Sequence, residues 1–169
     1  HARNAWLQGL SPKQNREIPP LRYEHVYRLK RDFPSLTIVI NGGITTTDQV
    51  RMHLGQLDGV MVGREAYHNP AWLASWDHDF YSGTCGEVLP GRAGGAAFLD
   101  AIEHAMVDYM EREATQYGTP WSSIARHMLG LRQGRPGARK WRQVWSDHRL
   151  KTLAPAEVMH CASQAAQVS

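Results

Sequence analysis

The sequence predicts an α/β fold joined to an all-α domain, namely the last part of a β/α barrel followed by a group of helices. Three observations support this prediction. Short β-branched runs alternate with helical segments in the first half of the chain. A glycine-rich stretch follows at residues 83–95, and beyond it only helical patterns recur. We therefore expect a barrel portion at residues 1–82, a linker at 83–95 and a helical domain at 96–169.

The composition is typical of a folded protein without membrane spans. Of the 169 residues, 42% are hydrophobic and 21% are charged, and no apolar run approaches the roughly 20 residues that a membrane helix needs. Cys85 and Cys161 lie far apart without metal-type spacing, so we expect no disulfide framework, no structural metal site and a cytoplasmic location. The chain opens directly on His1-Ala2-Arg3, without a helix cap or a polar lead-in. We therefore expect it to be a fragment.

The first half is predicted to alternate helices and strands. Residues 1–20 show little apolar periodicity and end in Pro19-Pro20, which indicates a long loop. We expect His1 to close a third strand before this loop. Residues 21–32 fit a helix that Pro34 ends. The elements expected after it are a strand at 36–40, a helix capped by Thr46 or Thr47 that ends near Leu54, a strand at 58–63, and a helix from Arg64 onward.

Both predicted strands are continuous apolar runs, which is typical of strands buried on both faces of a parallel sheet. An eight-stranded barrel needs about 250 residues. This part of the chain would therefore supply only the last quarter to third of a barrel.

The second half is predicted to contain four helices. They cover residues 96–116, a segment that begins near Pro120, residues 138–145 and residues 155–166, with a turn region at 130–137. The first of them carries an apolar stripe of Phe98, Ile102, Ala105, Met106, Tyr109 and Met110.

Two glycine turns follow the predicted strands. Asn41-Gly42-Gly43 follows the first strand, and Gly63-Arg64 follows the second. Glycines let backbone N–H groups approach an anion closely, and the helix after each turn adds its positive end. Loops after the last two strands of β/α barrels commonly bind phosphate, to which Arg64 would add a fixed charge. The alternative is that these glycines only turn the chain, but two such turns in consecutive units favour a phosphate site.

The segment 118–151 is strongly basic. Its cationic residues are Arg126, Arg132, Arg135, Arg139, Lys140, Arg142, Arg149 and Lys151, and its one acid is Asp147. Such an excess indicates a surface for phosphate backbones, with a solvated basic face as the alternative. Arg139 and Arg142 share a helix face. Trp141 and Trp145 share a face too, and we expect them in the core rather than stacked on bases.

Four segments of the chain resemble the tRNA-dihydrouridine synthase family, and within it the DusA subfamily. They are HARNAWLQGLSPKQNR at 1–16, INGG at 40–43, DGVMVGREAY at 58–67 and RHMLGL at 126–131. The opening segment is the most specific of them. The resemblance covers nearly the whole chain and weakens after about residue 146.

The resemblance implies an FMN-bearing TIM-type β/α barrel with a helical tRNA-binding domain, a monomer at full length. Such an enzyme uses NADPH to reduce the C5–C6 double bond of uridine in the tRNA D-loop, and the subfamily suggests positions 20 and 20a. The cofactor-binding residues that it implies are His1, Asn41, Gly42, Gly43, Gly63 and Arg64. The tRNA-binding residues that it implies are Lys13, Arg16, Arg126, His127, Arg132, Arg139 and Arg142.

The sequence also departs from the family pattern. The family's proton-donating cysteine and a flavin-contacting lysine lie in upstream segments absent here, so no catalytic residue is assigned, and neither Cys85 nor Cys161 takes that role. We therefore expect the chain alone to be inactive. Arg132 stands where the family pattern has phenylalanine, which either alters the packing or adds a phosphate contact.

Two other functions stay open. One is a barrel oxidoreductase that binds FMN or another phosphate compound and acts on a small molecule, which would leave the basic helical half without a role. The other is a non-catalytic RNA-binding module, which would leave the βα units unexplained.

Overall fold

The computed structural model describes residues 1–81 and 95–167. It divides the chain into two compact units, His1–Glu65 and Ala66–Ser169. The linker predicted at 83–95 lies, except for Gly95, outside the described residues. None of the described helices is both long enough and apolar enough to cross a membrane.

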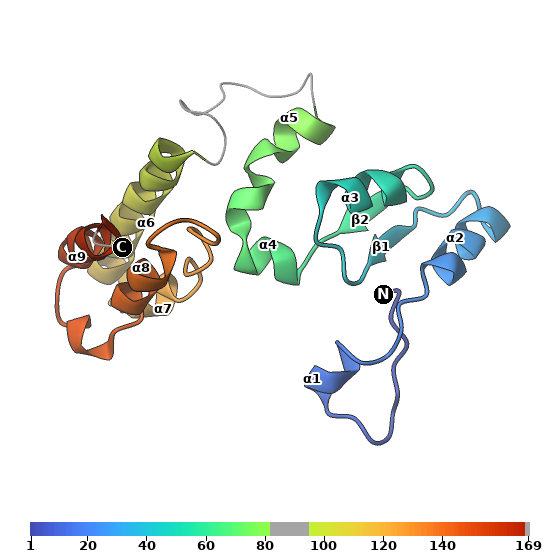
Figure 1. The fold of residues 1–169 in the computed structure, drawn as a ribbon, viewed down its shortest axis with the longest axis horizontal. Coiled ribbons are helices and arrows are strands. Elements are labelled where there is room, and N and C mark those ends of the chain that lie inside the picture. Colours follow the sequence, from blue (N-terminus) through green and yellow to red (C-terminus); the bar gives the residue numbers. More distant parts are fainter. Residues whose placement is uncertain (82–94, 168–169) are drawn as a thin grey trace. The chain divides into compact units, whose positions relative to one another are not determined.

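The first unit contains a small parallel sheet with helices before, between and after its strands (Figure 1). Its elements are α1 (Pro12–Asn15), α2 (Tyr23–Asp32), β1 (Val39–Asn41), α3 (Thr47–Leu54), β2 (Gly59–Met61) and the start of α4 (Arg64–His68). β1 pairs with β2 in parallel. The predicted order of helix, strand, helix, strand and helix is therefore confirmed, and so is the predicted cap of α3, where the Thr46 side chain accepts from the Gln49 N–H.

The start of the chain lies beside the end of β1. The Ala2 N–H donates to the Asn41 carbonyl over 2.7 Å, and Arg3 forms an isolated antiparallel bridge with Leu21. His1 is thereby held next to the carboxyl end of the sheet.

The prediction that both strands are buried on both faces is wrong for this chain. Ile40 is 1% exposed, but Val39 is 54% and Met61 50% exposed. The reason is that the described residues contain only the strands β1 and β2, so one face of each strand has no neighbour to cover it. The apolar composition of the strands is that of a larger sheet.

The opening loop contains one short helix that the apolar pattern did not predict. Ser11 and Gln14 form a capping box at the start of α1, and Pro12 begins the helix. The Asn15 side chain then accepts from the Trp6 N–H and donates to the Trp6 carbonyl, at 2.8 and 2.9 Å. These contacts close the loop on itself.

The second unit is helical. After the end of α4 it contains a 3₁₀ helix η1 (Pro70–Ser75), α5 (Trp76–Phe80), α6 (Ala96–Tyr117), α7 (Trp121–Ala125), α8 (Ala138–Trp145), a 3₁₀ helix η2 (His148–Leu150) and α9 (Pro155–Gln167). The helices predicted at 96–116, 138–145 and 155–166 are confirmed. The helix predicted near Pro120 is present but short: Pro120 lies just before it, and it ends at Ala125, whereas it was expected to reach Leu129. The short elements η1, α5 and η2 were not predicted.

The core of the second unit is built around tryptophans and α6. Trp141 and Trp145 are 0% and 2% exposed, which confirms that they are core residues and not a stacking platform. The buried side of α6 consists of Leu99, Glu103, Val107 and Met110. It is rotated from the predicted stripe, since Tyr109 is 39% exposed. A carboxylate therefore lies on the buried side of the longest helix.

Candidate functional site

The two glycine turns lie at one edge of the parallel sheet. Asn41 and Met61 are partners in the register of β1 and β2, so the segments that follow them leave the sheet at the same end. Gly42 and Gly43 follow Asn41 directly, and Gly63 and Arg64 follow β2 after one residue. The structure thus brings together the two predicted turns, as the carboxyl edge of a parallel sheet requires.

Gly42 and Gly43 are needed for the shape of the first turn. Their φ angles are +134° and +67°, which L residues with a side chain rarely adopt. A Cβ on Gly43 would lie 2.6 Å from Cδ1 of Leu21, and one on Gly42 would lie 3.0 Å from Cδ2 of the same side chain. The Tyr23 hydroxyl donates to the Gly42 carbonyl over 2.6 Å. The turn is therefore fixed from one side, and a substitution there would strain it.

His1 lies beside this turn. Its Cε1 would be 3.4 Å from a Cβ built on Gly42. Its Nδ1 accepts from the Arg3 N–H over 3.1 Å, so in the neutral ring the proton is on Nε2. The side chain is exposed and offers that N–H as a donor at the edge of the sheet.

The second turn is open where the first is tightly packed. A Cβ on Gly63 would meet only Sδ of Met61, at 3.9 Å. The Arg64 side chain after it is 53% exposed; its Nη2 donates to the Arg16 carbonyl over 3.3 Å and its Nη1 lies 3.7 Å from Glu17. An exposed pair at that distance holds a guanidinium weakly. Arg64 is therefore close to the opening loop and available to an anion.

The chemistry of this edge suits the phosphate end of a flavin nucleotide. It combines two backbone turns with glycines, one imidazole N–H and one guanidinium, all of which donate. The exposed Lys13 and Arg16 of the opening loop add positive charge within the same unit. The residues present therefore fit a phosphate group such as the one that FMN carries.

Behind the first turn, α2 and α3 meet through aromatic and imidazole side chains. His53 is 0% exposed, its Nδ1 is 2.7 Å from the Tyr27 hydroxyl, and its ring packs edge-on against Tyr23 at 4.6 Å. Its Nε2 has no hydrogen-bond partner among the described residues. Burial lowers the pKa of His53 and raises the pKa of Tyr23. Both side chains are therefore held neutral near pH 7, and Tyr23 remains a donor to the turn.

In the second unit, most of the predicted basic residues are on the surface. Arg139 and Arg142, on successive turns of α8, are both exposed. Within residues 1–81 and 95–167 neither makes an ion pair with an acid, and Arg142 Nη1 donates to the Gln133 side chain over 3.1 Å. The acid of the basic segment, Asp147, is bound by Arg149, which lowers the pKa of that carboxyl to about 2. The segment therefore keeps an excess of exposed positive charge.

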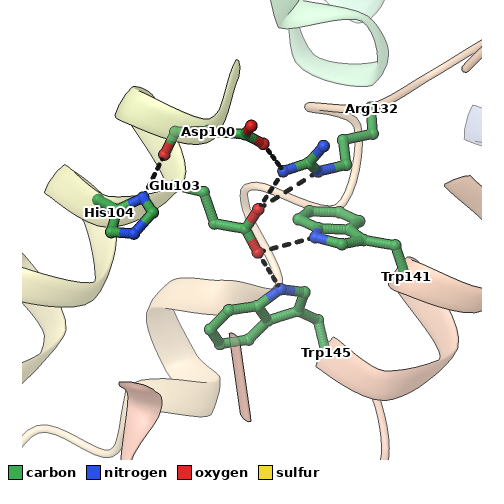
Figure 2. Close-up of polar contacts among 6 residues, drawn as sticks. All are labelled: Asp100, Glu103, His104, Arg132, Trp141 and Trp145. Carbon is green, nitrogen blue, oxygen red and sulfur yellow. Dashed lines mark hydrogen bonds and ion pairs between the residues drawn. The ribbon is translucent and has the colours of Figure 1, made fainter. Parts of the chain in front are cut away.

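Arg132 is placed differently from the other basic residues. Its Nη2 lies 2.6 Å from Glu103 Oε2, and the other oxygen of Glu103 accepts from the indole N–H groups of Trp141 and Trp145, at 2.7 and 2.8 Å (Figure 2). Asp100 binds the same guanidinium from the rim of the cluster. Of the two roles considered for Arg132, the geometry favours packing, since its side chain is 18% exposed and directed at acids of α6.

Sequence reasoning missed Glu103, although a signal was present. A carboxylate on the buried side of a helix needs donors, and two tryptophans at i and i+4 need acceptors. Glu103, Trp141 and Trp145 satisfy one another, and Arg132 compensates the charge.

Arg126 and His127 lie together beside Tyr67. The Arg126 Nε–H donates to His127 Nε2 over 3.0 Å, and His127 Nδ1 is 2.9 Å from the Tyr67 hydroxyl. Both predicted RNA-binding residues therefore line one surface of the second unit.

Comparisons with known proteins agree on one family. Residues 1–167 match the family model described as dihydrouridine synthase. The chain is 52% identical over 167 residues to a tRNA-dihydrouridine(20/20a) synthase of Shewanella oneidensis, covering 99% of this chain and 47% of the relative. It is 51% identical over 162 residues to one of Escherichia coli K12 and 50% identical over 165 residues to one of Synechocystis. These matches cover 96% and 98% of this chain and 44% and 46% of the two relatives, so the chain spans about half the length of the curated relatives it matches.

Proposed function

Because this chain belongs to the dihydrouridine synthase family, we propose that it supplies the flavin phosphate site and an RNA-binding surface of an enzyme that reduces uridine to dihydrouridine in tRNA. The relatives that it matches are named for positions 20 and 20a of tRNA, and we extend those positions to this chain. FMN would bring the redox chemistry and NADPH the electrons.

The observation that carries the proposal is the juxtaposition of two glycine turns at one sheet edge. Asn41, Gly42 and Gly43 offer backbone donors in a fixed turn, and Gly63 leaves space for an anion to approach. Arg64 supplies the permanent charge, and His1 the imidazole N–H. In this assignment the edge belongs to a larger TIM-type barrel, which would also cover the exposed faces of Val39 and Met61.

The RNA-binding surface is assigned to the exposed basic residues. Lys13 and Arg16 lie on the opening loop, and Arg126, His127, Arg139 and Arg142 lie on the helical unit. Guanidinium groups on successive turns of a helix suit successive phosphates of an RNA backbone. The target uridine must leave its stack before any chemistry can reach its ring, so these residues would hold the surrounding RNA while the base is extruded. Arg132 belongs to this set by sequence resemblance, but its pairing with Glu103 gives it a stabilising role first.

No residue of this chain is assigned as the proton donor. Cys161 is exposed on α9, and Cys85 lies outside the described residues. In our proposal the donor comes from the part of the family's length that this chain does not span, and the complete enzyme is a cytoplasmic monomer.

The proposal is tested with a chimaera in which this chain replaces the matching 167 residues of the Shewanella oneidensis relative. The purified chimaera should show flavin absorbance and should shift unmodified tRNA in a gel. The uncovered half of the relative alone is the control, and it should do neither. Flavin without tRNA binding would indicate an oxidoreductase for a small molecule instead, and tRNA binding without flavin would indicate an RNA-binding module.

A further inference from the structure

A cavity of the helical unit is lined mainly by residues whose side chains carry hydrogen-bond donors. Its volume is about 630 Å³, and its lining includes Tyr67, Arg126, His127, Gln133 and Arg142. None of the residues that line it is an acid, although the unit has many acids elsewhere. Two guanidinium groups without a lining acid make an anion the ligand that this cavity suits.

The hydrogen bonds of His127 determine which way the Tyr67 hydroxyl faces. Arginine only donates, so the 3.0 Å contact from Arg126 Nε makes His127 Nε2 an acceptor. The proton of the neutral ring is then on Nδ1, which donates to the Tyr67 oxygen 2.9 Å away. The Tyr67 O–H is consequently left to donate elsewhere. Tyr67 is 50% exposed, so that donor is accessible from the cavity.

Backbone contact keeps these groups together. A Cβ added to Gly130 would overlap the carbonyl of His68 and come within 2.9 Å of the carbonyl oxygen of Tyr67. Only glycine allows the two segments to approach this closely. Tyr67 and His127, which are 60 positions apart in sequence, are therefore held at hydrogen-bonding distance by a close backbone contact.

We propose that this cavity binds one phosphate of the tRNA backbone, with the Tyr67 hydroxyl, oriented through His127, and the Arg126 guanidinium as its donors. This inference rests on the proposed function and adds Tyr67 to the RNA-binding residues. A phosphodiester oxygen accepts from both groups, while Arg142, which also lines the cavity, contributes charge. Tyr67 contributes a neutral hydrogen bond, and Arg126 contributes a hydrogen bond and a positive charge. The salt dependence of tRNA binding distinguishes the two contributions.

The test is the affinity for tRNA as a function of salt, for the 169-residue chain and in parallel for the chimaera. Tyr67→Phe removes one neutral donor, so it should weaken binding about tenfold at every salt concentration without changing the slope of log K against log salt. Arg126→Ala should weaken binding by at least as much and flatten the slope by about 0.7–0.9, the value of one lost phosphate contact. Tyr117→Phe is the matched control, because Tyr117 is 70% exposed on α6 and away from the cavity.

The double variant tests whether the two residues share one ligand. If they do, Tyr67→Phe should cost clearly less than tenfold in the Arg126→Ala background. Millimolar inorganic phosphate should weaken tRNA binding by the wild type more than by the double variant. Circular dichroism and thermal melting show whether each variant is folded. If Arg126→Ala does not fold, Arg142→Ala replaces it in the salt-dependence measurement.

The cavity assignment is overturned if the wild type binds tRNA and both Tyr67→Phe and Arg126→Ala bind it with the same affinity and the same salt slope as the wild type. A wild type that does not bind tRNA in either protein would instead contradict the proposed function itself.

Discussion

Glu103 offers a prediction about stability that the structure makes quantitative. The side chain is 1% exposed, and its two oxygens accept from Trp141, Trp145 and Arg132. In Glu103→Gln one oxygen becomes an NH₂ group, which cannot accept. In either orientation of the amide its NH₂ group faces other donors: the two indole N–H groups in one orientation and the guanidinium in the other (Figure 2).

The expected cost follows from the loss of one partner of a buried ion pair, which is typically about 3–5 kcal/mol. We expect the lower end, about 3 kcal/mol, because Arg132 keeps Asp100 as a partner. Urea unfolding followed by tryptophan fluorescence and by far-ultraviolet circular dichroism measures this, and the thermal midpoint should fall by roughly 10 °C or more.

Two matched variants locate the effect. Glu111→Gln makes the same chemical change at an exposed position of the same helix and should change stability by less than about 0.5 kcal/mol. Asp100→Asn removes the outer, half-exposed acid and should cost no more than about 1 kcal/mol. If Glu103→Gln unfolds at the same urea concentration as Glu111→Gln, the buried cluster does not hold the helices together and the reasoning fails.

Further predictions concern the first unit, the flavin and the RNA. Burial lowers the pKa of His53, so the unfolded chain binds the proton more readily than the folded chain. The free energy of unfolding should therefore be highest above the ordinary pKa of 6.5 and fall as the pH drops below it. His53→Gln should flatten that pH dependence in urea titrations from pH 5 to 8. In the chimaera, Arg64→Ala should lower FMN affinity about tenfold to a hundredfold with little change in tRNA affinity, and full flavin retention after dialysis would count against the phosphate contact. Replacing Arg139 and Arg142 together with alanine should weaken tRNA binding and flatten its salt slope by about 0.7–0.9 per lost contact at constant flavin content; a wild-type slope would remove α8 from the RNA surface. The 169-residue chain alone should purify without bound FMN, because it spans only about half the length of its relatives. Stoichiometric flavin in its absorbance spectrum would contradict this.

The elements that sequence predicted well are those with strong local signals. α6, α8 and α9 follow helical periodicity bounded by glycine or proline, and β1 and β2 follow short β-branched runs. Both glycine turns were predicted from their position after these strands, and the parallel register brings them to one edge.

The features that were missed depend on contacts between distant residues. Glu103 is on a buried helix face only because Trp141 and Trp145, 38 and 42 positions later, offer donors to it. Tyr67 meets His127 across 60 positions, and nothing in the local sequence of either residue indicates the pair. The exposure of Val39 and Met61 cannot be read from the apolar runs alone, which do not show how many strands surround them; it follows from the prediction that this chain supplies only part of a barrel.

In our proposal this chain carries the flavin edge and the RNA surface of a dihydrouridine synthase. The most direct measurement is the amount of dihydrouridine that the chimaera forms in unmodified tRNA with NADPH, located by mass spectrometry of nuclease fragments. We expect dihydrouridine at positions 20 and 20a. In Arg64→Ala at limiting FMN, the amount of dihydrouridine formed should fall strongly. A folded chimaera that holds FMN and binds tRNA but leaves every uridine unreduced would contradict the account.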